Sequence, residues 1–122
     1  MTTLGVGVDI VDVPRFALAL ERHPRLAQRL FTDDERRDAH AQPERLAARF
    51  AAKEAVSKAF GTGIGAQLGW QDIEIRRKET GEPFVVLHGK GAELFAARGA
   101  RQLHLSLTHT ENYAAATTIL ES

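Results

Sequence analysis

Three side chains of the kind that handle phosphate groups stand in two separate stretches of the sequence. Asp9 lies within the apolar run LGVGVDIVD, and Glu54 and Lys58 lie within RFAAKEAVSKAF. Two carboxylates suit Mg²⁺, which typically takes one or two carboxylates and completes its shell with waters and substrate phosphates. A lysine beside them could offset negative charge on a transferring phosphoryl group. The set favours phosphoryl-type transfer, although spacing along the chain does not by itself bring Asp9 to Glu54.

Each member of this set also has an ordinary structural interpretation. Asp9 taken alone is a polar residue satisfied near a strand end, and Glu54 with Lys58 is a helix ion pair that contributes only about 0.3–0.5 kcal/mol. The loop Gly61–Gly65 either cradles phosphate oxygens with its backbone N–H groups or reverses the chain. It is not a Walker A loop, because no Gly-Lys-Ser/Thr follows and it ends a helix rather than opening one. His109, among Ser and Thr at a strand end, is on its own more typical of a hydrogen-bonded structural residue.

Other chemistries find little support in the sequence. There is no cysteine, which excludes disulfides and thiolate metal sites. Ser57 and Ser106 lack the context of a nucleophile elbow. The remaining histidines have no partner at zinc-binding spacing: His23, His40, His88 and His104.

Length and composition bound the class of protein. The 122 residues, 43% of them hydrophobic and 26% charged, predict a single domain spanning residues 1–122. Lys and Arg total 16, as do Asp and Glu, so the overall charge indicates no nucleic-acid partner. The N-terminus lacks a basic region before its apolar run, and no run is long enough to cross a bilayer. We therefore expect a cytoplasmic protein without a membrane segment.

The acid at position 9 belongs to a predicted strand whose two faces differ. Period-two alternation places Leu4, Val6, Val8 and Ile10 on one face, opposite a face that carries Asp9 and two glycines. Strand glycines mark close approach by a ligand or by another backbone. Asp12 and Pro14 predict a helix start directly after this strand, interrupted near Pro24. Thr32 and Glu35 form a capping-box pattern for the next helix.

A long helix is predicted from about Glu44 to Phe60, ending at Gly61. Its apolar arc is rich in alanine, which indicates close packing against a sheet. Glu54 and Lys58 are neighbours on the opposite side. WQDIEIR and FVVLH predict a hairpin whose first strand turns Ile73 and Ile75 inward and Glu74 outward. A short helix (GKGAELFAARGA) and two strands (RQLHLSLTH, YAAATTILES) complete an α+β fold, with a mostly antiparallel sheet packed against a long helix.

Three stretches together resemble one family. GVGVDIVDVPRF, then RFAAKEAVSKAFGTGIG followed by WQDIEI, and HLSLTHTENYAAA occur in the order and spacing of bacterial holo-[acyl-carrier-protein] synthases, the short, single-module 4′-phosphopantetheinyl transferases. The likeness runs from about Leu4 to Ile119 and implies the fold of that family. Departures are small, with Thr108 where many relatives have Ser and Ala19 where a bulkier apolar residue is common.

The resemblance implies Mg²⁺-dependent transfer of 4′-phosphopantetheine from coenzyme A to a serine of apo-acyl carrier protein. Adenosine 3′,5′-bisphosphate is released, and the product serves fatty acid biosynthesis. Asp9 and Glu54 match the two Mg²⁺ ligands, and Lys58 matches the catalytic lysine that contacts the phosphates. The group that takes the serine proton stays open among a metal-bound water, Glu54 and Lys58. The rival hypotheses are a non-catalytic module that binds coenzyme A or a nucleotide and a metal-dependent phosphohydrolase.

The same resemblance assigns the binding residues. His109 matches the residue that reaches the nucleotide from a neighbouring subunit, which implies a homotrimer with shared sites. Arg15, Arg22 and Arg25 match a basic helix that docks the acidic carrier protein, with a solvated helix face as the alternative. The residues that match the coenzyme A-binding region are Arg49, Lys53, Lys58, Gly61, Gly63, Ile64, Gly65 and His109.

Overall fold

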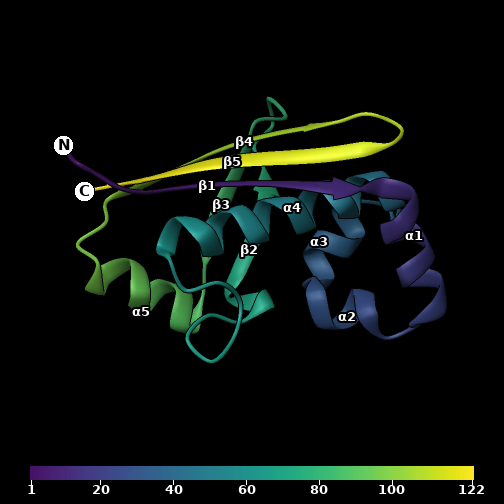
Figure 1. Cartoon of the computed structure of the whole chain (residues 1–122), viewed down its shortest axis with the longest axis horizontal. Coiled ribbons are helices and arrows are strands. Elements are labelled where there is room, and N and C mark those ends of the chain that lie inside the picture. Colours follow the sequence, from purple (N-terminus) through teal and green to yellow (C-terminus); the bar gives the residue numbers. More distant parts are fainter.

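The computed structural model describes residues 1–122, in five strands, five α-helices and one 3₁₀ turn (Figure 1). In chain order these are β1 (Thr3–Asp12), α1 (Val13–Arg22), α2 (Leu26–Leu30), α3 (Asp33–Asp38), α4 (Pro43–Phe60), η1 (Trp70–Asp72), β2 (Ile73–Arg77), β3 (Pro83–Leu87), α5 (Gly89–Ala97), β4 (Gln102–His109) and β5 (Tyr113–Glu121). None of the helices is long and apolar enough to span a membrane.

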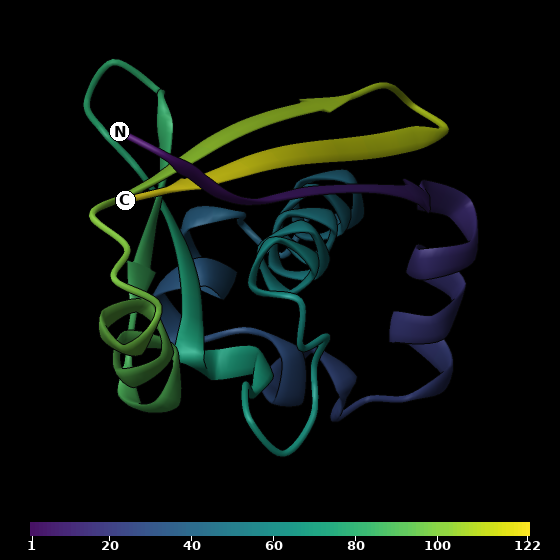
Figure 2. The same cartoon turned by 60° about the vertical axis from the view of Figure 1, so that its left-hand side comes forward.

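The strands form two antiparallel sheets, one of three strands in the order β1-β5-β4 and one hairpin of β2 and β3. Figure 2 shows α4 beneath the three-stranded sheet, with α1 to one side and α5 with the hairpin on the other. The predicted α+β fold with a mostly antiparallel sheet on a long helix is confirmed.

The contact between α4 and β1 depends on small residues from both elements. The alanines of α4 that face the sheet are buried, as the alanine-rich arc predicted. On β1, a Cβ added at Gly5 or Gly7 would lie 1.9 Å from Ala59 O or 1.8 Å from Ala55 O. Strand glycines allow close approach by a ligand or by another backbone, and here the close neighbour is the backbone of α4. Val6, Val8 and Ile10 point to the outer face and are 61%, 63% and 67% exposed.

Local caps define where the helices begin and end. Asp12 accepts a hydrogen bond from Arg15 N (3.0 Å) and caps α1, and Thr32 forms the predicted capping box with Glu35 at α3. Helix α4 begins at Pro43, where the missing N–H is harmless. It ends at Gly61, whose φ of 80° lies in the left-handed region that glycine accepts.

The prediction that Glu74 points outward is wrong, since its side chain is only 3% exposed. Other parts of the protein cover both faces of the β2–β3 hairpin. The alternation of apolar and polar residues along β2 therefore does not distinguish a core face from a solvent face. Thr32 Oγ1 donates to Glu74 (2.7 Å), Arg76 Nε donates to it (2.9 Å), and the ring of His88 lies 3.0 Å away. Burial alone would raise the pKa of Glu74, but the hydrogen bonds from Thr32, His88 and Arg76 outweigh burial and lower it.

Candidate active site

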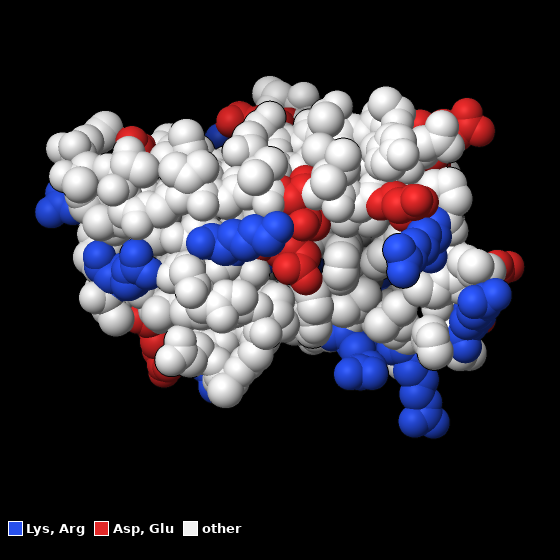
Figure 3. All heavy atoms as spheres, viewed as in Figure 1, with Lys and Arg blue, Asp and Glu red and all other residues white.

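Asp9 and Glu54 line one open groove of about 590 Å³. Asp9 comes from β1 and Glu54 from the middle of α4, and the groove is closed at its other side by Phe16 and Arg15 of α1. The fold thus brings together two acids that lie 45 residues apart in the sequence. Figure 3 shows that acidic side chains gather near the middle of the face seen in Figure 1, with basic side chains beside them.

Lys58 contacts Asp9 rather than its helical neighbour Glu54. Its Nζ donates to Asp9 Oδ1 at 3.0 Å and to the carbonyl oxygen of Val8 at 3.0 Å. The Lys58 side chain is 50% exposed, whereas that of Asp9 is 18% exposed. The predicted Glu54–Lys58 ion pair is therefore replaced by a pair that ties α4 to β1 and leaves half of the lysine open to a ligand.

Glu54 is the member of the set without a partner, because its carboxylate makes neither a hydrogen bond nor an ion pair. Partial burial raises its pKa, the charge of Asp9 raises it further, and the charge of Lys58 opposes both. An ionised Glu54 thus lies near a second carboxylate with too little positive charge to balance the two. A bound cation would relieve that repulsion.

The donor set fits a hard cation with few protein ligands. Nowhere does the chain gather three or more His, Asp or Glu side chains in a group able to hold a metal ion. An ion between Asp9 and Glu54 would therefore keep most of its shell for water and substrate oxygens. That arrangement suits Mg²⁺ and does not suit a structural zinc site, which is closed by four ligands.

The glycine loop begins where α4 ends, three residues after Lys58. Gly61 and Gly63 have φ of 80° and 66°, and a Cβ at either, or at Gly65, would meet nothing within 4 Å. Ile64 packs against the core and anchors the loop from inside. The loop is consequently open on its outer side, with room for a bulky anion next to Lys58.

Two predicted coenzyme A ligands on α4, Arg49 and Lys53, do not lie in this groove. Arg49 is 2% exposed and pairs with Asp38. Lys53 is fully buried, and burial lowers its pKa against the opposing pull of Glu35. Because successive helical residues are about 100° apart, Lys53 turns into the core while Glu54 faces the groove. Its lack of exposed surface leaves Lys53 no contact with a ligand.

His109 lies outside the groove of its own chain. It lines a separate pocket of about 310 Å³ together with Arg45 and Arg77, and the two sets of lining residues have no member in common. Sequence reasoning missed Arg45 and Arg77, which stand on different elements and share no motif. It also missed Phe50, which lines the groove with Glu54 and could have been found from its position one helical turn earlier.

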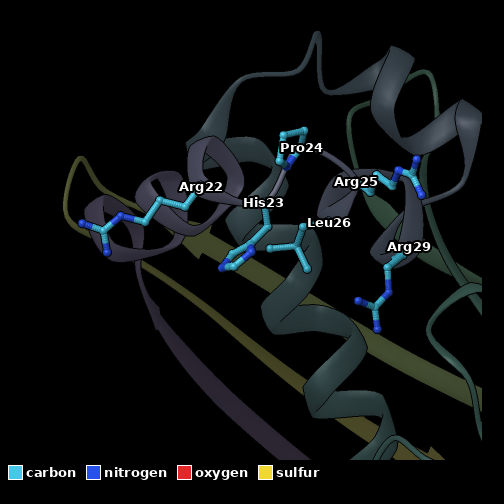
Figure 4. Close-up of a pocket in the computed structure, with 6 residues that line it drawn as sticks. All are labelled: Arg22, His23, Pro24, Arg25, Leu26 and Arg29. Atoms are coloured by element: carbon cyan, nitrogen blue, oxygen red, sulfur yellow. The ribbon is translucent and has the colours of Figure 1, made fainter.

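The predicted docking arginines divide between two places. Arg15 lines the groove itself, next to Phe16 and Glu54. Arg22 and Arg25 line a pocket of about 580 Å³ at the corner between α1 and α2, together with His23 and Arg29. Figure 4 shows Arg25 and Arg29 on one side of this corner and Arg22 reaching away on the other. None of the four arginines takes part in an ion pair, so their charges are available to an acidic partner.

Comparisons with known proteins place this geometry in a family. A family profile described as the 4′-phosphopantetheinyl transferase superfamily matches residues 5–118. The holo-[acyl-carrier-protein] synthase of Koribacter versatilis is 47% identical over 122 residues, covering 97% of this chain and 98% of the relative.

Solved structures agree with the sequence match. The Helicobacter pylori holo-[acyl-carrier-protein] synthase in complex with coenzyme A superposes with a TM-score of 0.88 at 27% identity, covering 95% of this chain and 99% of that one. The Bacillus anthracis synthase in complex with coenzyme A (3′,5′-ADP) gives a TM-score of 0.83 at 34% identity, covering 100% and 99%.

Proposed function

Because the chain belongs to the holo-[acyl-carrier-protein] synthases of the 4′-phosphopantetheinyl transferase superfamily, we propose that it moves 4′-phosphopantetheine from coenzyme A to a serine of apo-acyl carrier protein. The observation that carries this proposal is that Asp9 and Glu54 line one groove and that Lys58 contacts Asp9 there. The binding of coenzyme A by the Helicobacter pylori relative supports the choice of donor. The reaction takes place in the cytoplasm and supplies holo-carrier to fatty acid biosynthesis, with residues 1–122 acting as one catalytic domain.

The proposed reaction exchanges one P–O bond for another and moves one proton. The serine oxygen bonds to the phosphorus that carries pantetheine, the P–O bond to adenosine 3′,5′-bisphosphate breaks so that this group departs, and the serine proton passes to Glu54, Lys58 or water. Asp9 and Glu54 would hold Mg²⁺, which would supply positive charge against the pyrophosphate oxygens. Lys58, whose side chain is half exposed, would bind phosphate oxygens with the ammonium donor that Asp9 and Val8 do not use. The open loop at Gly61, Gly63, Ile64 and Gly65 accommodates the nucleotide end.

The site is completed by a second copy of the chain in this proposal. Val6, Val8 and Ile10 of β1 form an exposed apolar row, extended by Tyr113 and Ile119 of β5. Apolar patches of this kind mark protein interfaces. A homotrimer that covers them would bring His109, whose pocket is separate from its own chain's groove, to the groove of a neighbour.

The carrier protein docks on the side of the groove formed by α1. Arg15 stands at the groove, and Arg22 and Arg25 add positive charge at the α1–α2 corner. Their unpaired charges complement an acidic carrier and would direct its serine towards Asp9 and Glu54. Such complementarity raises the association rate and fixes orientation more than it adds affinity.

The direct test is intact-protein mass spectrometry of apo-acyl carrier protein incubated with the enzyme, coenzyme A and Mg²⁺. We expect a mass gain of one phosphopantetheine arm, which disappears with a chelator, with Asp9→Asn, or with a carrier whose acceptor serine is replaced by alanine. Coenzyme A binding without a mass gain would show a non-catalytic module. Coenzyme A cleavage without any carrier would show a phosphohydrolase.

A further inference from the structure

Lys53 stands directly before Glu54 on α4 and has no part in the proposed reaction. Its side chain is completely buried, and its ammonium has three donors to satisfy. They meet Glu35 Oε1 at 2.7 Å, the carbonyl oxygen of Trp70 at 2.9 Å and the carbonyl oxygen of Ile73 at 2.6 Å. Every hydrogen-bonding position of this lysine is therefore used inside the protein.

The partner acid, Glu35, is equally enclosed and equally satisfied. It is also 0% exposed, and its Oε1 accepts a hydrogen bond from Thr32 N at 2.9 Å. Its Oε2 accepts one from Ile75 N at 2.8 Å. The pair thus joins α4 to α3, to η1 and to the start of β2 through directional bonds.

Stability does not account for a pair of this kind. Removing two charges from water costs free energy, which offsets their mutual attraction. Proteins in which well-packed apolar residues of similar size replace such a pair are often as stable or more stable. A buried pair does impose geometry, because hydrogen bonds fix direction whereas apolar contacts do not.

The other face of α4 offers few bulky side chains that could fix its rotation. It meets β1 through alanines such as Ala55 and Ala59 and through Gly5 and Gly7, which present almost no side chains to interlock. The directional bonds on that side are those of Lys58 to Val8 and Asp9 and of Thr118 to the carbonyl oxygen of Ala55. A turn of about 20° about the helix axis would move a side-chain end about 5–6 Å from that axis by about 2 Å. Displacements near 1 Å already lower catalytic rates by about 10²-fold.

We propose that Lys53, held by Glu35, is a positioning residue that fixes the rotation of α4 and thereby aims Glu54 at Asp9. This inference rests on the proposed function, because the geometry that Lys53 fixes is that of the cation site formed by Asp9 and Glu54. The same bonds hold Trp70, whose ring stacks on Phe50 of the groove at 5.1 Å between centroids. Trp70 is the single tryptophan, so its fluorescence reports on this junction.

The test compares a variant without the pair to one that loses stability elsewhere. Lys53→Met with Glu35→Gln removes both charges and keeps similar size. Leu120→Ala, in β5 at the end of the sheet away from the groove, is the control for lost stability. Thermal melts, Trp70 fluorescence, calorimetric binding of Mg²⁺ to the apo protein, kcat and the KM for coenzyme A are measured for each.

We expect the folded double variant to bind Mg²⁺ at least tenfold more weakly, to lose about 10²-fold in kcat, and to keep its KM for coenzyme A. Its Trp70 emission should shift, whereas Leu120→Ala should keep wild-type emission, metal affinity and kcat below its melting temperature. Wild-type metal affinity in the double variant, or an equal loss in the control, would overturn the proposal. If the double variant does not fold, Lys53→Gln decides instead, with at least threefold weaker Mg²⁺ binding supporting the inference and unchanged binding refuting it.

Failure of the proposed function has a different signature. It would leave the wild-type enzyme unable to modify apo-carrier, whatever the variants do. Metal binding that is lost with Asp9→Asn and weakened without Lys53 would then still show that the buried pair orients the two acids.

Discussion

Replacing Gly7 by alanine tests whether the close contact of β1 with α4 creates the site. A Cβ at this position would lie 1.8 Å from Ala55 O and 2.7 Å from Ala55 C, whereas real Cβ atoms essentially never come closer than 3.0 Å. Both neighbours are backbone atoms, so neither can rotate away as a flexible side chain could. The strand and the helix must therefore separate locally by about 1.2 Å.

That displacement affects both stability and activity. Overpacking of this kind typically lowers the free energy of unfolding by about 1–3 kcal/mol. Asp9 is two residues further along the same strand, and its 3.0 Å contact with Lys58 crosses the interface that opens. A misplacement near 1 Å lowers catalytic rates by about 10²-fold, so we expect a loss of that order in kcat/KM.

Carrier modification followed by intact mass, at a temperature where the variant is folded, measures the activity, and a thermal melt measures the stability. Gly65→Ala is the matched control for stability, since a Cβ there meets nothing within 4 Å. It should be neutral or stabilising by up to about 1 kcal/mol, because alanine reduces the freedom of the unfolded chain. A Gly7→Ala protein with wild-type stability and kcat/KM would refute the close-contact argument.

Three further outcomes follow from the charges in and around the groove. The pKa of Glu54 is higher in the folded state than its value of 4.5 in the unfolded chain. Its contribution to the free energy of unfolding is therefore fully present below pH 4.5 and is lost as pH rises through the folded-state pKa. Without divalent ions, Glu54→Gln should therefore melt higher than wild type at pH 7 and converge with it towards pH 4, and equal melting at pH 7 would contradict the assigned repulsion. Arg15→Glu should raise the KM for carrier more at low salt than at high salt, and a KM independent of salt would exclude the docking role. His109→Ala and Glu54→Gln should each be inactive and should regain activity when mixed under conditions of subunit exchange, whereas no recovery despite exchange would refute shared sites.

The fold could be predicted from the sequence wherever one local rule acted without competition. Asp12 and Thr32 occupy the N-cap positions that their side chains favour, and Gly61 supplies the left-handed residue that ends α4. The family could also be predicted, because three separate stretches kept their order and spacing, and the full-length relatives confirm it. Glu74 shows the limit of the alternation of apolar and polar residues along a strand. Alternation assigns a residue to one face of the strand but does not tell whether other elements cover that face.

The site was only partly predictable for a related reason. The types and spacing of Asp9, Glu54 and Lys58 indicated phosphate chemistry, and the fold places the two acids in one groove with Lys58 in contact with Asp9. Lys53 and Glu54 are adjacent in the sequence motif, which therefore predicted a role in the same site for both. On a helix they point about 100° apart, and only the packing of α3 and the hairpin against α4 determines which of the two is enclosed.

Two different features of the fold control where Glu54 lies with respect to Asp9. The missing side chains of Gly5 and Gly7 set the distance between β1 and α4, because any Cβ there would collide with helix backbone. They do little to set the rotation of α4, since a surface of glycine and alanine offers few side chains for a rotated helix to strike. Lys58 and Thr118 bond across this interface, and Lys53 fixes the rotation further from the opposite side, where it reaches backbone oxygens of η1 and β2. A sequence in which the glycines were kept and Lys53 was lost would therefore hold the two acids close together with poorer alignment.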